Sequence, residues 1–206
     1  MSLEPIFNPK TAMFTAQDDK LESPNPMYRL ALYSQQIPTK NPAMDSRLLE
    51  LIGVAKPNIG YISSSPDQDK AYFSPMQSYY ADLGAKLTAY TDIENAEDSS
   101  HLNTLFDCDA IHLSGGNTFF FLAWLRQTGL DKKLIAYAAD NCLIGVSAGA
   151  ILMTPSIETS LLCGDDDSFS DGDHAGFSLV PFNFLPHYTQ AQETSVDSDI
   201  LTYGCP

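Results

Sequence analysis

The chain has 206 residues, 44% of them hydrophobic, which is enough for one sizeable core and too few for two full domains. Its 26 acidic residues outnumber 11 Lys and Arg and give a net charge of −15, which argues against nucleic acid or an anionic membrane as a partner. No stretch approaches the roughly 20 apolar residues of a membrane span, and the N-terminus lacks a signal-peptide pattern. We therefore expect a cytoplasmic protein.

The cysteines are widely spaced and form no Cys-x-x-Cys pair; they are Cys108, Cys142, Cys163 and Cys205. This spacing indicates neither a zinc site nor a disulfide framework. We expect reduced thiols, and no cofactor or metal is implied.

The predicted elements begin after an extended arm or leader, expected over residues 1–27 because this stretch is polar and lacks periodicity. A single domain is expected over residues 28–206. Its predicted strands cover residues 29–33, 59–62, 86–90, 110–113 and 142–146, and its predicted helices cover residues 45–54, 70–83, 100–106, 118–128 and 131–139. Strands that alternate with helices predict an α/β fold, a three-layer sandwich with a mainly parallel sheet and helices on both faces.

A Gly-x-Ser-x-Gly motif occupies residues 145–149, directly after the last predicted strand and before the helix-forming residues 150–153. A strand-to-helix turn of this kind is typical of a nucleophile elbow, which exposes a serine hydroxyl close to backbone N–H donors. The same pentapeptide also occurs in glycine-rich turns without a catalytic role. The interpretation as a nucleophile elbow therefore depends on the predicted strand before it and the helix-forming residues after it. Ser147 is the candidate nucleophile.

Two adjacent glycines follow the strand predicted at 110–113. In a parallel sheet, catalytic groups gather beyond the carboxyl ends of the strands. The N–H of Gly115 or Gly116 could supply one donor to an oxyanion, and the N–H of Ala148 could supply the other. A phosphate-binding turn is the alternative, but the sequence lacks the third glycine of a dinucleotide fingerprint and the Gly-Lys-Ser/Thr of a P-loop. The next two residues, Asn117 and Thr118, are candidate substrate-binding residues.

A serine nucleophile needs a base, and the chain offers four histidines. His112 lies within a predicted strand and is expected in the core. His101 lies at a helix start, and His174 lies in an acidic loop where a solvated position is expected. His187 ends the apolar run 177–186, which we expect to return to the sheet edge as a strand or extended segment. His187 is therefore the candidate general base.

Three segments together resemble one family. They are Ser-Gly-Gly-Asn-Thr-Phe at 114–119, Gly-Val-Ser-Ala-Gly-Ala at 145–150, and Pro-Phe-Asn-Phe-Leu-Pro-His-Tyr-Thr at 181–189. Their order and spacing are similar to those of the dipeptidase E and cyanophycinase family of serine peptidases, over about residues 28–200. The resemblance implies a class I glutamine amidotransferase-like fold, with serine where the amidotransferases carry cysteine.

The resemblance also implies the chemistry: hydrolysis of small peptides by acyl transfer to Ser147, with His187 as general base. Gly115, Gly116 and Ala148 would then form the oxyanion hole. A small peptide is the expected partner, and homo-oligomerisation is left open.

The chain departs from the family pattern at three places. Ser114 replaces the first glycine of the glycine-rich turn. Ser195 stands where dipeptidase E has an arginine for the substrate's N-terminal aspartate, and a hydroxyl cannot replace a guanidinium there. The resemblance puts the triad acid either between Ser and His or further toward the C-terminus, where we expect the family's terminal strands to be lacking. Asp165 aligns best, with Asp166 and Asp167 as substitutes; a solvated acidic loop is the alternative.

Two other classes of function stay open. A catalytically inactive relative would use the same cleft to bind a small ligand or a partner. The acidic loop over residues 165–174 could instead hold calcium, although its spacing does not match an EF-hand. A fluorophosphonate probe tests the first alternative, and a calcium titration tests the second.

Overall fold

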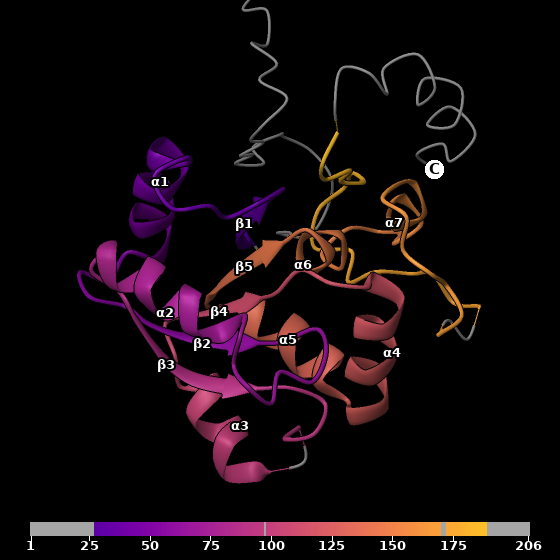
Figure 1. The fold of residues 1–206 in the computed structure, drawn as a ribbon, viewed down its shortest axis with the longest axis horizontal. Coiled ribbons are helices and arrows are strands. Elements are labelled where there is room, and N and C mark those ends of the chain that lie inside the picture. Colours follow the sequence, from indigo (N-terminus) through magenta and orange to yellow (C-terminus); the bar gives the residue numbers. More distant parts are fainter. Residues whose placement is uncertain (1–26, 97, 170–171, 189–206) are drawn as a thin grey trace, which may run out of the picture.

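Five parallel strands form one sheet in the computed structural model, which describes residues 27–96, 98–169 and 172–188 (Figure 1). The arm expected over residues 1–27 thus lies outside the described residues, apart from Met27. The strand order is β1-β5-β4-β2-β3, with the bounds β1 (Arg29–Tyr33), β2 (Asn58–Ile62), β3 (Lys86–Thr91), β4 (Ala110–Leu113) and β5 (Cys142–Val146).

Helices connect successive strands and cover both faces of the sheet (Figure 1). Their bounds are α1 (Pro42–Ile52), α2 (Phe73–Asp82), α3 (Ser99–Phe106), α4 (Thr118–Thr128), α5 (Leu130–Ala138), α6 (Ala148–Ile151) and α7 (Thr159–Leu162). Side chains of α1 and α2 fill the core on one face, and those of α3 to α6 fill the core on the other. The predicted three-layer α/β fold is confirmed. Among the described residues, no helix is long and apolar enough to cross a bilayer.

Alternate residues of β5, an interior strand of the sheet, enter opposite cores. Leu143 packs in the core under α3 to α6, whereas Cys142 and Ile144 pack in the core under α1 and α2. All three are fully buried. Because a strand alternates its side chains between two faces, and both faces are covered here, the strand reads as a continuous apolar run.

Helix boundaries differ from the prediction where polar groups or proline determine them. Helix α1 begins at Pro42, because a first-turn proline sacrifices no intrahelical hydrogen bond. Helix α2 begins at Phe73 instead of residue 70. The carboxylate of Asp67 accepts hydrogen bonds from the N–H groups of Ala71 (2.8 Å) and Phe73 (3.1 Å), so it satisfies donors at the start of that helix.

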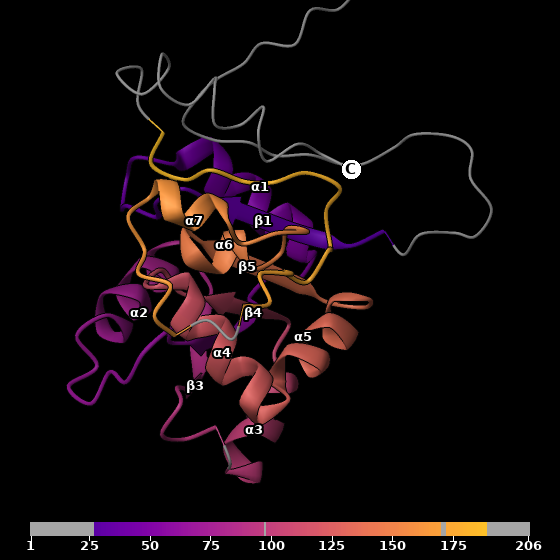
Figure 2. The ribbon, with the colours of Figure 1, turned by 90° about the vertical axis from the view of Figure 1, so that its right-hand side faces the viewer.

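The run 177–186 contains no strand. Of the two forms expected for it, a strand or an extended segment, the strand is therefore wrong. The N–H groups of Phe177 and Leu179 donate to the carbonyl oxygens of Leu152 and Met153 beside α6. The prolines at 181 and 186 have no N–H to donate and cannot continue a ladder. Figure 2 shows this part of the chain, orange to yellow, passing over α6 and α7 toward β1.

Candidate active site

Ser147 occupies the turn between β5 and α6 with φ 51° and ψ −110°. A non-glycine residue in such a conformation costs about 1–3 kcal/mol, which the surrounding contacts must offset. The N–H of Ser147 donates to the carbonyl oxygen of Tyr33 at the end of β1, at 2.8 Å. The turn is thereby tied to the neighbouring strand.

The two glycines of the motif allow close approach of α6 to the sheet. A Cβ on Gly145 would lie 2.5 Å from the carbonyl oxygen of Gly149, and a Cβ on Gly149 would lie 2.2 Å from that of Leu113. The N–H of Gly149 also donates to the carbonyl oxygen of Ser114 at 3.1 Å. Since these neighbours are backbone atoms, any larger residue would push the serine turn off β4 and β5.

The structure brings Ser147 and His187 together: Oγ of the serine lies 2.9 Å from Nε2 of the histidine. This distance is within the range for proton transfer to a general base. His187 is exposed, has φ 59°, and donates its backbone N–H to Oγ of Ser34 at 2.8 Å. No local motif marks Ser34, although its place directly after β1 fits the rule that sites lie at strand ends.

The glycine turn after β4 lies beside the candidate nucleophile. A Cβ on Gly115 would lie 3.5 Å from Cβ of Ser147. No atom of the described residues accepts a hydrogen bond from the N–H groups of Gly115, Gly116 or Ala148. Backbone donors with no internal acceptor, next to a nucleophile, are the groups that an oxyanion hole requires.

The acidic loop contacts the start of α4. Oδ2 of Asp165 accepts the N–H of Thr118 at 2.8 Å, and Asn117 donates its side-chain amide to the carbonyl oxygen of Asp166 at 2.8 Å. Oδ1 of Asn117 accepts the N–H of Phe120 as the N-cap, and Thr118 is fully buried. Of the two side chains proposed to bind substrate, that of Asn117 thus contacts the protein itself, and that of Thr118 is buried with no hydrogen-bond partner for its Oγ1 among the described residues.

Asp165 does not reach the histidine. Within the described residues, no carboxylate pairs with His187, and its Nδ1 has no hydrogen-bond partner. The pKa of Asp166 is lowered because its carboxylate accepts hydrogen bonds from the backbone and hydroxyl of Ser168. The expected triad role of Asp165 is therefore corrected: its carboxylate caps α4, and the described residues form a Ser–His pair.

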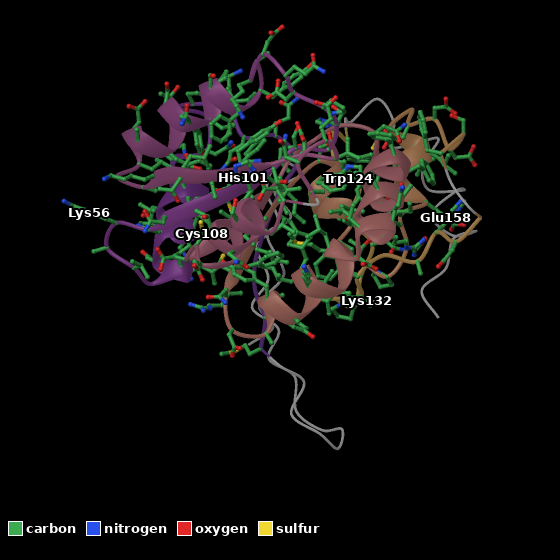
Figure 3. All side chains as sticks on the ribbon, turned by 90° about the horizontal axis from the view of Figure 1, so that it is seen from below. Lys56, His101, Cys108, Trp124, Lys132 and Glu158 are labelled. Carbon is green, nitrogen blue, oxygen red and sulfur yellow. The ribbon has the colours of Figure 1, made fainter. Side chains whose placement is uncertain are left out.

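Among the described residues, no other histidine is hydrogen-bonded to Ser147. His112 is buried with Nδ1 2.8 Å from the hydroxyl of Tyr80, as expected for a core residue, and burial lowers its pKa to about 3. His101 is exposed on α3, away from Glu158 (Figure 3). His174 lies half-buried with Nδ1 3.5 Å from Oε1 of Glu158, so the solvated position expected for it is wrong.

Three of the cysteines are free thiols, as expected: Cys108, Cys142 and Cys163. Burial raises the pKa of Cys142 to about 12 and that of Cys163 to about 11, so neither thiol ionises appreciably at neutral pH. No group of three or more His, Cys, Asp or Glu within the described ranges could hold a metal ion.

Sequence comparisons place the chain among peptidases. The profile of peptidase family S51 matches residues 30–202. An uncharacterised peptidase of Listeria monocytogenes is 34% identical over 96 residues, which are 46% of this chain and 47% of that protein. Peptidase E of Nostoc sp. is 31% identical over 121 residues, 58% of this chain and 47% of that protein. The chain spans about half the length of these curated relatives.

Solved structures agree with the sequence comparisons. A crystal structure of a candidate peptidase E from Listeria monocytogenes superimposes with a TM-score of 0.61 at 26% identity, covering 77% of this chain and 81% of that one. A peptidase from an acI-B1 Actinobacterium, at 18% identity and TM-score 0.53, shares the fold over 84% of this chain and 74% of that one. The class I glutamine amidotransferase-like fold is confirmed. The chain belongs to peptidase family S51.

Proposed function

We propose that the chain is a serine peptidase that hydrolyses small peptides by acyl transfer to Ser147, with His187 as general base. The observation that carries the proposal is the 2.9 Å approach of Ser147 Oγ to His187 Nε2 at a strand-to-helix turn. Membership of family S51 supports the class of reaction.

In the proposed reaction, Nε2 of His187 takes the proton of the Ser147 hydroxyl as Oγ attacks the peptide carbonyl carbon. The N–H groups of Ala148 and of the Gly115–Gly116 turn hold the resulting oxyanion. His187 then gives the proton to the leaving amine as the C–N bond breaks. Water attacks the acyl-enzyme by the same route, so the cycle regenerates Ser147 and needs no cofactor.

The test is covalent labelling with an alkyl fluorophosphonate combined with cleavage of a dipeptide and tripeptide library. We expect mass spectrometry to locate the label on Ser147. Ser147→Ala should abolish labelling, and both Ser147→Ala and His187→Gln should lower peptide turnover about 10⁴-fold or more. Ser74→Ala removes an exposed hydroxyl on α2 and serves as the control. Equal cleavage by the wild type and Ser147→Ala would refute the proposal.

An inactive relative that binds a ligand in the same cleft is the second candidate. The observation that favours it is the absence, among the described residues, of a carboxylate on His187. Peptide binding by calorimetry, without fluorophosphonate labelling or turnover, would identify this function. The cytoplasmic location stays a prediction, and homo-oligomerisation stays open.

A further inference from the structure

The peptide group between Gly115 and Gly116 is held by two hydroxyls. Oγ of Ser64 donates to the carbonyl oxygen of Gly115 at 2.6 Å, and Oγ of Ser114 donates to the same oxygen at 3.1 Å. In a planar trans peptide the C=O and N–H point in opposite directions. Fixing the Gly115 carbonyl therefore also fixes the direction of the Gly116 N–H.

The glycine turn lies between Ser64 and Ser147. An L side chain on Gly116 would place its Cβ 2.0 Å from Oγ of Ser64, and Gly116 has φ 143°, so only glycine fits there. On Gly115, a Cβ would instead point to Cβ of Ser147, 3.5 Å away. Because the carbonyl is directed at Ser64, the Gly116 N–H is directed away from Ser64, in a turn whose neighbouring residue, Gly115, lies beside Ser147.

Ser64 is itself held firmly after the end of β2. Its N–H donates to Oγ of Ser114 at 2.8 Å, and its carbonyl oxygen accepts the indole N–H of Trp124 at 3.0 Å. Ser64 is 4% exposed, and Trp124, labelled on α4 in Figure 3, is 1% exposed. A hydroxyl presented by such a fixed backbone can orient the peptide group that it contacts.

We infer that Ser64 is a positioning residue for the oxyanion hole, acting through the Gly115–Gly116 peptide without touching a reacting atom. The inference rests on the proposed function. Since the oxyanion forms only in the transition state, loss of the Ser64 hydroxyl lowers kcat and leaves KM nearly unchanged. Loss of a whole oxyanion donor costs about 10²- to 10³-fold, and a misdirected donor costs less.

The test measures kcat and KM for p-nitrophenyl acetate, and the labelling rate with an alkyl fluorophosphonate, in the full chain. For Ser64→Ala we expect kcat and the labelling rate to fall together by about 10- to 100-fold, with KM within about twofold. Ser64→Cys, which keeps the size but donates weakly, should fall in between. Ser63→Ala is the matched control, because Ser63 precedes Ser64 and is similarly buried, at 2% exposure; its kcat should stay within about twofold of wild type.

The outcomes separate the two proposals. Near-wild-type kcat and labelling in a folded Ser64→Ala overturn the positioning role while the peptidase proposal stands. If Ser64→Ala fails to fold by circular dichroism, Ser64→Cys decides: an unchanged kcat overturns the role, and a reduced kcat at unchanged KM supports it. If the wild type and Ser147→Ala turn over the ester equally, the proposed function itself fails.

Discussion

Oγ of Ser34 accepts the backbone N–H of His187 at 2.8 Å, across 153 residues of sequence. Ser34 follows β1, whose last carbonyl oxygen, on Tyr33, accepts the N–H of Ser147. The end of one strand thus contacts both the candidate base and the candidate nucleophile. This arrangement fixes the histidine backbone, whose positive φ would otherwise be unfavourable.

Ser34→Ala should therefore lower kcat about 3- to 30-fold, because the imidazole loses its backbone anchor but keeps its chemistry. Peptide or ester turnover at saturating substrate measures the effect. Ser74→Ala, an exposed serine on α2, should behave as wild type. Equal kcat for the two variants would mean that the loop holds His187 without Ser34.

Asp165 offers a second test, because its carboxylate accepts the Thr118 N–H at the start of α4. Asp165→Asn keeps an acceptor oxygen and should retain turnover within about threefold, whereas Asp165→Ala should lose about 1 kcal/mol of unfolding free energy with the cap. Turnover and urea unfolding of both variants provide the measurements. A triad acid would behave differently: its Asn variant would lose about 10⁴-fold in kcat at little cost in stability.

The sequence predicted the features that depend on local pattern. The apolar strand 142–146 and the Gly-x-Ser-x-Gly turn specify the position of Ser147 without knowledge of the tertiary fold. The cap formed by Asp165 joins residues 47 apart, and no local rule identifies it. Ser64 meets Gly115 only because β2 and β4 are adjacent in the sheet, an order that alternation of elements does not specify.

The sequence of the run 177–186 contains evidence both for and against a strand. Its apolar composition favoured a strand, yet Pro181 and Pro186 both argue against ladder pairing. The prediction that His187 lies within hydrogen-bond reach of Ser147 is nevertheless confirmed. It requires only that the segment ends beside Ser147, whether or not the segment is a strand.

The residue at position 195, a serine outside the described residues, predicts how the chain selects its substrate. A neutral hydroxyl cannot form the paired hydrogen bonds that a guanidinium gives a carboxylate, so an N-terminal aspartate should bring no large advantage. We expect kcat/KM values for Asp-Leu and Ala-Leu that agree within about tenfold. A preference of several hundredfold for Asp-Leu would show that another cation binds the aspartate.

The free energy of unfolding should depend on pH through the lowered pKa of His112. Burial lowers its pKa to about 3 in the folded chain, whereas an unfolded histidine titrates near its usual pKa of 6.5. Between these values the unfolded chain binds one more proton at this residue. The stability linked to His112 is therefore fully present above pH 6.5 and is lost as the pH falls toward 3, by about 1.4 kcal/mol per pH unit.

Urea unfolding at pH 7, 6 and 5 tests this in wild type, His112→Phe and the exposed control His101→Asn. The phenyl ring can keep the stack on Tyr61, whose centroid lies 4.7 Å from that of the imidazole, and Gln36 still contacts the Tyr80 hydroxyl. Wild type and His101→Asn should both lose stability between pH 7 and pH 5 more steeply than His112→Phe. The difference in slope should correspond to the uptake of about one proton on unfolding. Parallel curves for all three chains would show that His112 takes up its proton while folded, contrary to its burial against Tyr80.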